Sequence, residues 1–164
     1  MGNEFRDMQR IYTCLWFDDQ ALEAASFYVS VFPNSRVVEI KYYLDGAPSP
    51  PGTVLTVFFE LDGVAHLALN GGPVFKFSPA MSLVANCDTQ QEIDTLWRRL
   101  SEGGQEGQCG WLTDRFGVSW QIVPRVLPAL LNSADAAASQ RAFSALMKMT
   151  KLDIAELQRA YENR

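Results

Sequence analysis

The sequence predicts an α+β fold made of two paired β-α-β-β-β modules and a C-terminal helical extension. Strand-like and helix-like segments occur in the same order twice, in residues 11–69 and in residues 80–124. Each module also closes with a Gly-Val pair that opens a strand, in DGVAHLAL and in FGVSWQIV. Because an internal repeat indicates a repeated structural unit, we expect the two modules to form one concave sheet. The helices would cover its outer face and a central cleft would open inside.

The first module begins with the β-branched and aromatic residues of segment 11–17, which predict a strand. The apolar residues of segment 18–32 recur at helical spacing, and the acidic residues at its start favour a helix N-terminus. The segments that follow are, in order, a strand at 36–44, a proline-rich loop at 45–52, and strands at 53–61 and 64–69 joined by the hairpin dipeptide Asp62-Gly63.

The second module follows a linker at 70–79. Its predicted elements are a strand at 80–87, a helix at 88–104 capped by Asp88 and stopped by Gly103-Gly104, irregular strands at 105–114, and a strand at 118–124. The extension, 125–164, predicts two or three helices that pack on the outside of the fold or on a partner subunit. One would be capped by Ser133 or Asp135, and another would start at Asp153 with a capping box at Glu156.

Composition limits the classes of partner. The chain has 164 residues and a net charge of −5, which gives no electrostatic footprint for nucleic acid or for an anionic membrane. No apolar run approaches the roughly 20 residues of a membrane helix, and the polar N-terminus does not resemble a signal peptide. Cys14, Cys87 and Cys109 are odd in number and widely spaced, which favours reduced thiols in a cytoplasmic protein.

Several strings then resemble a known family: CLWFDDQALEAASFYVSVFPNS, PGTVLTVFFELDG, LALNGGPVFKFSPAMSLVANCDTQQEIDTLWRRLSEGG and QCGWLTDRFGVSWQIVP. They are similar to the vicinal oxygen chelate superfamily of glyoxalases, extradiol dioxygenases, and fosfomycin- and bleomycin-resistance proteins. The closer resemblance is to its PhnB-like branch, often labelled demethylubiquinone methyltransferase-like. It places a PhnB-like domain at 9–124 and leaves 125–164 as the extension. We do not carry over methyl transfer, since the chain lacks a glycine-rich strand-to-helix loop for S-adenosylmethionine.

The resemblance implies a divalent metal held by ligands from the first and last strands of each module. The matching positions here are Thr13, His66, Ser82 and Gln121. Hydroxyl groups are poor ligands for a catalytic first-row metal, which favours imidazole and carboxylate. We therefore expect no cofactor and no full metal-ligand set, and at most weak binding of a divalent metal.

His66 is the only histidine, and its orientation has two interpretations. Side chains alternate along a strand, so His66 shares a face with Val64 and Ala68. If the leucine-bearing face packs on the helix, His66 faces the cleft and Asn70 follows it. Counting from the repeated Gly-Val pair instead matches His66 with Trp120, which places Leu67 in the cleft and His66 under the helix. A one-residue bulge would reconcile the two counts.

Two functions follow as hypotheses. In the first, the protein is an isomerase or lyase of the vicinal oxygen chelate type. His66 would be its general base, and Gln121, Ser82 and Thr13 would position an oxygen-rich substrate. In the second, it binds or sequesters a small molecule without catalysis, as bleomycin-resistance members do. The candidate ligand-binding residues are Thr13, Ser82, Asn70, Trp16, Trp111 and Trp120, with Phe75 as a further aromatic wall. The resemblance also implies a homodimer.

Overall fold

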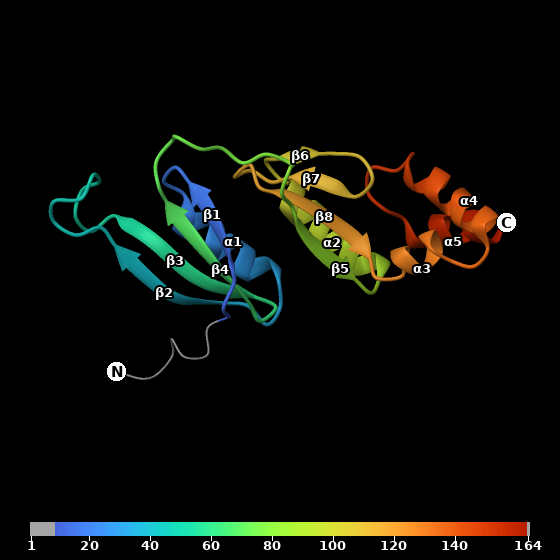
Figure 1. Ribbon diagram of the computed structural model, residues 1–164, viewed down its shortest axis with the longest axis horizontal. Coiled ribbons are helices and arrows are strands. Elements are labelled where there is room, and N and C mark those ends of the chain that lie inside the picture. The colour runs from blue at the N-terminus through green and yellow to red at the C-terminus, as the bar shows by residue number, and fades with distance from the viewer. Residues whose placement is uncertain (1–8, 164) are drawn as a thin grey trace. The chain divides into compact units, whose positions relative to one another are not determined.

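The computed structural model describes residues 9–163, and the chain divides after Lys76 into two compact units (Figure 1). Unit 1, up to Lys76, contains the first predicted module. Unit 2, from Phe77 on, contains the second module and the C-terminal helices. Each unit has its own four-stranded mixed sheet, so the predicted α+β fold with two repeated modules is confirmed. The central cleft between modules stays a prediction.

Unit 1 has the strand order β1-β4-β3-β2, with β1 parallel to β4 and the other neighbours antiparallel. Its elements are β1 (Thr13–Phe17), α1 (Ala21–Val31), β2 (Arg36–Tyr42), β3 (Val54–Leu61) and β4 (Val64–Asn70). Asp62 and Gly63 both have positive φ, at 47° and 75°, so the predicted hairpin between β3 and β4 forms with a primed turn. Helix α1 lies close to its sheet because Ala21, Ala24 and Ala25 are fully buried.

Unit 2 repeats this arrangement with the order β5-β8-β7-β6, in which β5 is parallel to β8. Its module consists of β5 (Leu83–Cys87), α2 (Gln90–Ser101), β6 (Gln105–Glu106), β7 (Trp111–Thr113) and β8 (Ser119–Pro124). The prediction of Asp88 as N-cap of α2 is wrong by one residue. Thr89 caps the helix and forms a capping box with Glu92, while the Asp88 carboxylate accepts a hydrogen bond from Arg125.

The extension forms three helices, α3 (Leu127–Leu131), α4 (Ala136–Leu146) and α5 (Ile154–Glu162). Asp135 and Asp153 cap α4 and α5 by accepting hydrogen bonds from the amides of Ala138 and Glu156. These helices share a small apolar core around Leu146, Leu152 and Leu157, against which Cys109 and Val123 of the module also pack. No helix in residues 9–163 combines the length and the apolar content that a membrane crossing requires.

In both units one face of the sheet lies under a helix and the other face does not. In unit 1 the buried Phe59 of β3 packs near Tyr28 of α1, so odd-numbered residues of β3 face the helix. In unit 2 the Trp97 indole of α2 donates a hydrogen bond of 2.7 Å to Glu106, which pairs with Leu112 and so marks the helix side of β7. We call the opposite side of each sheet its open face.

Asp114 organises the turn between β7 and β8. Its side chain is buried, and its carboxylate accepts hydrogen bonds from the amides of Phe116 and Val118 and from the Trp120 indole, at 2.9–3.0 Å. A buried carboxylate requires such partners because its desolvation is costly. The same contacts hold the Trp120 side chain on the helix side of β8.

Asp114→Ala should therefore lower the free energy of unfolding by about 3 kcal/mol, because three donors lose a charged acceptor inside the protein. Urea denaturation followed by circular dichroism measures this loss. The matched control is Glu102→Ala, an exposed acidic residue of the same unit, which should change stability by less than about 0.5 kcal/mol. A loss for Asp114→Ala as small as that of the control would contradict the assigned role.

Candidate functional site

The open face of unit 2 brings together Trp111, Gln121 and Ser82. Gln121 lies opposite Trp111 across the β7–β8 pair and opposite Val84 across the β5–β8 pair. Its Nε2 donates a hydrogen bond of 3.0 Å to Ser82 Oγ. An aromatic ring, an amide and a hydroxyl thus lie together on a partly exposed surface. Their arrangement is that of a polar anchor beside an apolar wall.

All the side chains on this face of the described strands β5, β7 and β8 are uncharged. Alternation along the strands from the registers above places on it Ser82, Val84, Asn86, Trp111, Thr113, Ser119, Gln121 and Val123. None of these groups titrates near neutral pH, so the surface offers hydrogen bonds and apolar contact but no acid or base.

Around β1 and β4 the open face of unit 1 is mainly apolar, with Cys14, Trp16 and Leu67 beside Phe58 of β3. The Trp16 indole donates a hydrogen bond of 2.9 Å to the Gly72 carbonyl, and Phe75 packs edge-on against the Trp16 ring at 5.1 Å. A Cβ on residue 71 would fall 2.2 Å from the same ring, so only glycine at this position allows the backbone to approach Trp16 so closely. Residues 71–75 of the same chain therefore cover part of the Trp16 ring and use its N–H group, which leaves less of it for a ligand.

His66 does not lie on the open face. The residue is only 6% exposed, and its ring stacks on Phe59 at a centroid distance of 5.4 Å. Phe59 in turn packs near Tyr28 of α1. His66 and Phe59 are direct partners in the β3–β4 register, which has no bulge. The interpretation that turns His66 toward the cleft is therefore wrong, and the one that matches it with Trp120 holds. Both side chains lie on the helix side of their sheets, as the β8 register shows for Trp120.

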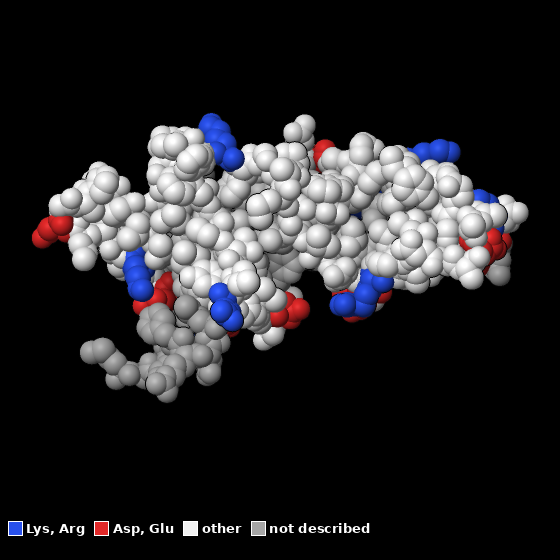
Figure 2. Space-filling model, in the orientation of Figure 1, with Lys and Arg blue, Asp and Glu red and all other residues white. Residues whose placement is uncertain are grey.

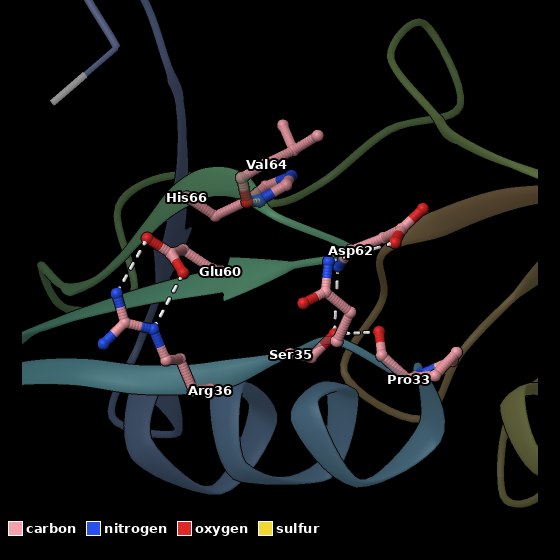
Figure 3. Close-up of polar contacts among 8 residues, drawn as sticks. Pro33, Ser35, Arg36, Glu60, Asp62, Val64 and His66 are labelled. Carbon is pink, nitrogen blue, oxygen red and sulfur yellow. Dashed lines mark hydrogen bonds and ion pairs between the residues drawn. The ribbon is translucent and has the colours of Figure 1, made fainter. Parts of the chain in front are cut away.

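The His66 imidazole is held as a neutral group. Its Nδ1 lies 2.9 Å from the Val64 carbonyl, so the neutral tautomer donates its proton there (Figure 3). Burial lowers the pKa of His66 from its ordinary value of 6.5, against a smaller opposing effect of this hydrogen bond. A ligand on the open face lies on the other side of the sheet from this ring.

Thr13 and Asn70 also lie on the helix side, since Thr13 is opposite His66 in the register and Asn70 follows His66 and Ala68 on the same face of β4. Asn70 has a structural environment: its Oδ1 accepts from the amide of Ala21 at the start of α1, and its Nδ2 donates to the Val54 carbonyl. These contacts join α1 to the sheet and leave Asn70 only 9% exposed. The prediction that Asn70 and Thr13 face a ligand in the cleft is therefore wrong for the same reason as for His66: all three side chains lie on the helix side of the sheet.

Sequence reasoning did not single out the charged residues on the open face of unit 1. Arg36 and Glu60 form a two-pronged ion pair across β2 and β3, with the shorter N–O distance 2.9 Å (Figure 3). Lys41 and Glu39 pair nearby at 3.4 Å. Strict alternation within RVVEIKY would place Arg36 on the face opposite to Glu39 and Lys41. The bulge between Val37 and Glu39 brings all three to the open face, which the sequence pattern does not predict.

Cys14 is the one thiol on this open face. Partial burial of its sulfur raises the thiol pKa above the ordinary value although the residue as a whole is exposed. The thiol is then protonated at neutral pH and is a weak nucleophile.

The donor set does not fit the metal centre that the resemblance implies. At the corresponding open-face positions the register places Cys14 and Leu67 in unit 1, and Val84 and Gln121 in unit 2. Within residues 9–163 no three His, Cys, Asp or Glu side chains gather as a metal-binding group. One amide and one thiol on separate sheets lack the imidazole and carboxylate ligands that catalytic first-row metals require.

The chain is similar to proteins of one known family. The family model described as 3-demethylubiquinone-9 3-methyltransferase matches residues 9–123. The PhnB protein from Bacillus cereus is 37% identical, with a TM-score of 0.66, and the match covers 71% of this chain and 99% of that one. The chain belongs to this PhnB-like family.

Two further solved structures share the fold of this PhnB-like chain. Protein PA1353 from Pseudomonas aeruginosa is 22% identical with a TM-score of 0.59, covering 71% of this chain and 97% of its own. The fosfomycin resistance protein FosX from Mesorhizobium loti is 13% identical with a TM-score of 0.50, covering 70% and 89%. No curated protein matches the chain.

The buried His66 predicts a pH-dependent stability. A folded pKa below the unfolded value means that the unfolded chain binds the proton more readily, so acid favours unfolding. Stability contributed by neutral His66 is present above pH 6.5 and is lost as the pH falls toward the lowered folded pKa, with a slope of at most about 1.4 kcal/mol per pH unit.

Urea titrations between about pH 5 and 8 measure this slope, with His66→Phe as the matched variant that keeps an aromatic ring at the stack. The difference in slope between wild type and variant isolates the single histidine from the carboxylates. Identical pH profiles for the two proteins would show that His66 is not held neutral in the fold.

Proposed function

We propose that the protein binds a small, planar, uncharged molecule on the open face of unit 2, without catalysing its conversion. The observation that supports this is the cluster of Trp111, Gln121 and Ser82 on a surface with no titratable side chain. A ring such as that of Trp111 offers a stacking platform, and the amide and hydroxyl groups offer directional hydrogen bonds. The function is therefore sequestration or transport rather than turnover.

The hydrogen bond between Gln121 and Ser82 favours a particular ligand chemistry. Gln121 Nε2 donates to Ser82 Oγ, which leaves Gln121 Oε1 as an acceptor and the Ser82 hydroxyl proton as a donor. A ligand carboxamide has the complementary pair, since its N–H can donate to Oε1 and its carbonyl can accept from the hydroxyl. A carboxamide or lactam on an aromatic ring thus fits both the polar pair and the Trp111 wall.

On its described strands, the open face of unit 2 has no charged side chain with which to select a charged ligand. The side chains on this face of β5, β7 and β8 are uncharged. In the view of the whole molecule in Figure 2, Lys, Arg, Asp and Glu side chains lie singly or in small groups among uncharged residues. The protein carries a net charge of −5. We therefore place specificity in shape and hydrogen bonding rather than in electrostatic attraction.

The isomerase or lyase hypothesis has weaker support. It requires His66 as a general base, and the His66 ring lies under α1 with its Nδ1 bonded to Val64. Methyl transfer, which the family description names, is also not proposed. The connections into α1 and α2 are the residues 18–20, Asp-Asp-Gln, and 88–89, Asp-Thr. They contain no glycine and so do not match the glycine-rich strand-to-helix loop that holds S-adenosylmethionine. We still expect the protein to be a homodimer in the cytoplasm.

Benzamide, an aromatic carboxamide, tests the proposal directly. Titrated into 15N-labelled protein, it should bind with a dissociation constant on the order of 1 mM and shift the side-chain signals of Trp111 and Gln121. Trp111→Ala should weaken binding at least about fivefold by removing the stacking surface, and Gln121→Leu should weaken it similarly by removing the acceptor.

Two controls make the experiment specific. Trp16→Phe in unit 1 should leave the benzamide affinity unchanged, and toluene, which lacks the carboxamide, should bind wild type more weakly than benzamide. Equal affinity in wild type and in Trp111→Ala would exclude this site. Saturable conversion of any added compound that depends on His66 would instead restore the enzymatic hypothesis.

A further inference from the structure

The turn that leads into Trp111 has an unusual backbone. Residues 108–111 form a tight turn closed by a hydrogen bond of 3.1 Å from the Trp111 amide to the Gln108 carbonyl. Its two central residues, Cys109 and Gly110, both have positive φ, at 59° and 83°. This is a primed turn, in which Asn, Asp or Gly is the preferred first central residue. A cysteine there is unfavourable, so the turn needs support from elsewhere.

That support comes from the loop between α4 and α5. The Cys109 amide donates to the Met149 carbonyl and the Gly110 amide donates to the Thr150 carbonyl, both at 2.8 Å. Leu152 also packs directly over Gly110, where an added Cβ would lie 3.1 Å from its side chain. Carbonyl groups of the C-terminal extension therefore accept from both central amides of the turn. Leu152 leaves no room for a side chain at position 110.

The loop is itself fixed to the module by Gln90 in the first turn of α2. Gln90 Nε2 donates to the Leu152 carbonyl at 3.0 Å, and its Oε1 accepts from the Ile154 amide at 2.9 Å. Lys151 forms an ion pair with Asp94 one turn further along the same helix. A bidentate amide contact of this kind orients the loop backbone, because it satisfies one donor and one acceptor together.

The extension also reaches the open face. Val123 lies two residues beyond Gln121 on the same side of β8, and it packs against the apolar core that α3, α4 and α5 share. The C-terminal helices therefore border the Trp111–Gln121 surface at one end. These helices lie beyond residue 123, where the family match stops.

We infer that the C-terminal extension is part of the binding site: its α4–α5 loop holds the turn at 108–111 and thereby positions Trp111, while its core closes the end of the open face next to Val123. This inference rests on the proposed binding at Trp111. Gln90 is then a positioning residue, which acts on Trp111 through the loop. Ligand size would be limited by the extension, a segment that the PhnB-like module does not itself supply.

The test compares Gln90→Ala with Gln91→Ala in the full chain. Gln91 is the exposed neighbour of Gln90 on the same helical turn and serves as the matched control. In Gln90→Ala, exchange of the Cys109 and Gly110 amide protons should accelerate at least about tenfold, because loosening the loop releases their acceptors. With 5-fluorotryptophan incorporated, the fluorine signal of Trp111 should shift or broaden while those of Trp97 and Trp120 stay unchanged. Benzamide affinity should fall several-fold.

A rescue variant separates positioning from general stability. Cys109→Asn places a residue that favours positive φ at the first central position, so the turn needs less support. Added to Gln90→Ala, it should restore slow exchange at Gly110 and the wild-type Trp111 signal. If Gln90 only stabilised the fold, Cys109→Asn would restore neither the slow exchange at Gly110 nor the Trp111 signal.

The inference is overturned if Gln90→Ala lowers the melting temperature while exchange at Cys109 and Gly110 and the Trp111 signal match those of Gln91→Ala. The outcomes also separate the two proposals. If wild-type protein does not bind benzamide at all, the proposed ligand chemistry fails, and the exchange and fluorine measurements still decide whether the extension positions Trp111.

Discussion

The structure depends on one constraint, that successive side chains of each strand lie on opposite faces while a single helix covers one of those faces. In unit 1 the stack of Tyr28, Phe59 and His66 fixes which face is covered. A one-residue shift of β4 would turn His66 away from the helix and force Leu67 under α1 in its place, so the register is strongly specified. In unit 2, Trp120 and Asp114 fix the corresponding choice. A ligand can reach only the face of each sheet that its helix does not cover.

The buried side chains of Asn70 and Asp114 use their hydrogen bonds within the fold. Asn70 is bonded to the first turn of α1, and Asp114 to the turn before β8. Among the described residues no buried side-chain nitrogen or oxygen lacks a hydrogen-bond partner. A polar residue in a strand can therefore be fully used by the fold. The polar groups left to bind a ligand are those on the open face, of which Gln121 and Ser82 are paired with each other.

The sequence carries most of the fold because its signals are local. Alternation and periodicity place the strands and helices, Asp62-Gly63 marks the hairpin, and Asp135 and Asp153 mark helix starts. The His66 orientation depended on which strand face packs on the helix, and here the repeated Gly-Val pair was a better guide than the leucine count. The contacts of Cys109 and Gly110 with Met149 and Thr150 could not be predicted, since they join backbone groups about 40 residues apart without a side-chain signal.

The central claim is that Trp111 and Gln121 face solvent while His66 and Trp120 lie under the helices, and relaxation of side-chain protons by a soluble gadolinium chelate tests it most directly. The account predicts strong relaxation of the Trp111 ring protons and the Gln121 side-chain amide, and little effect on the His66 ring and the Trp120 indole. His66 protons relaxed as strongly as those of Gln121 would contradict the register on which the binding site is built.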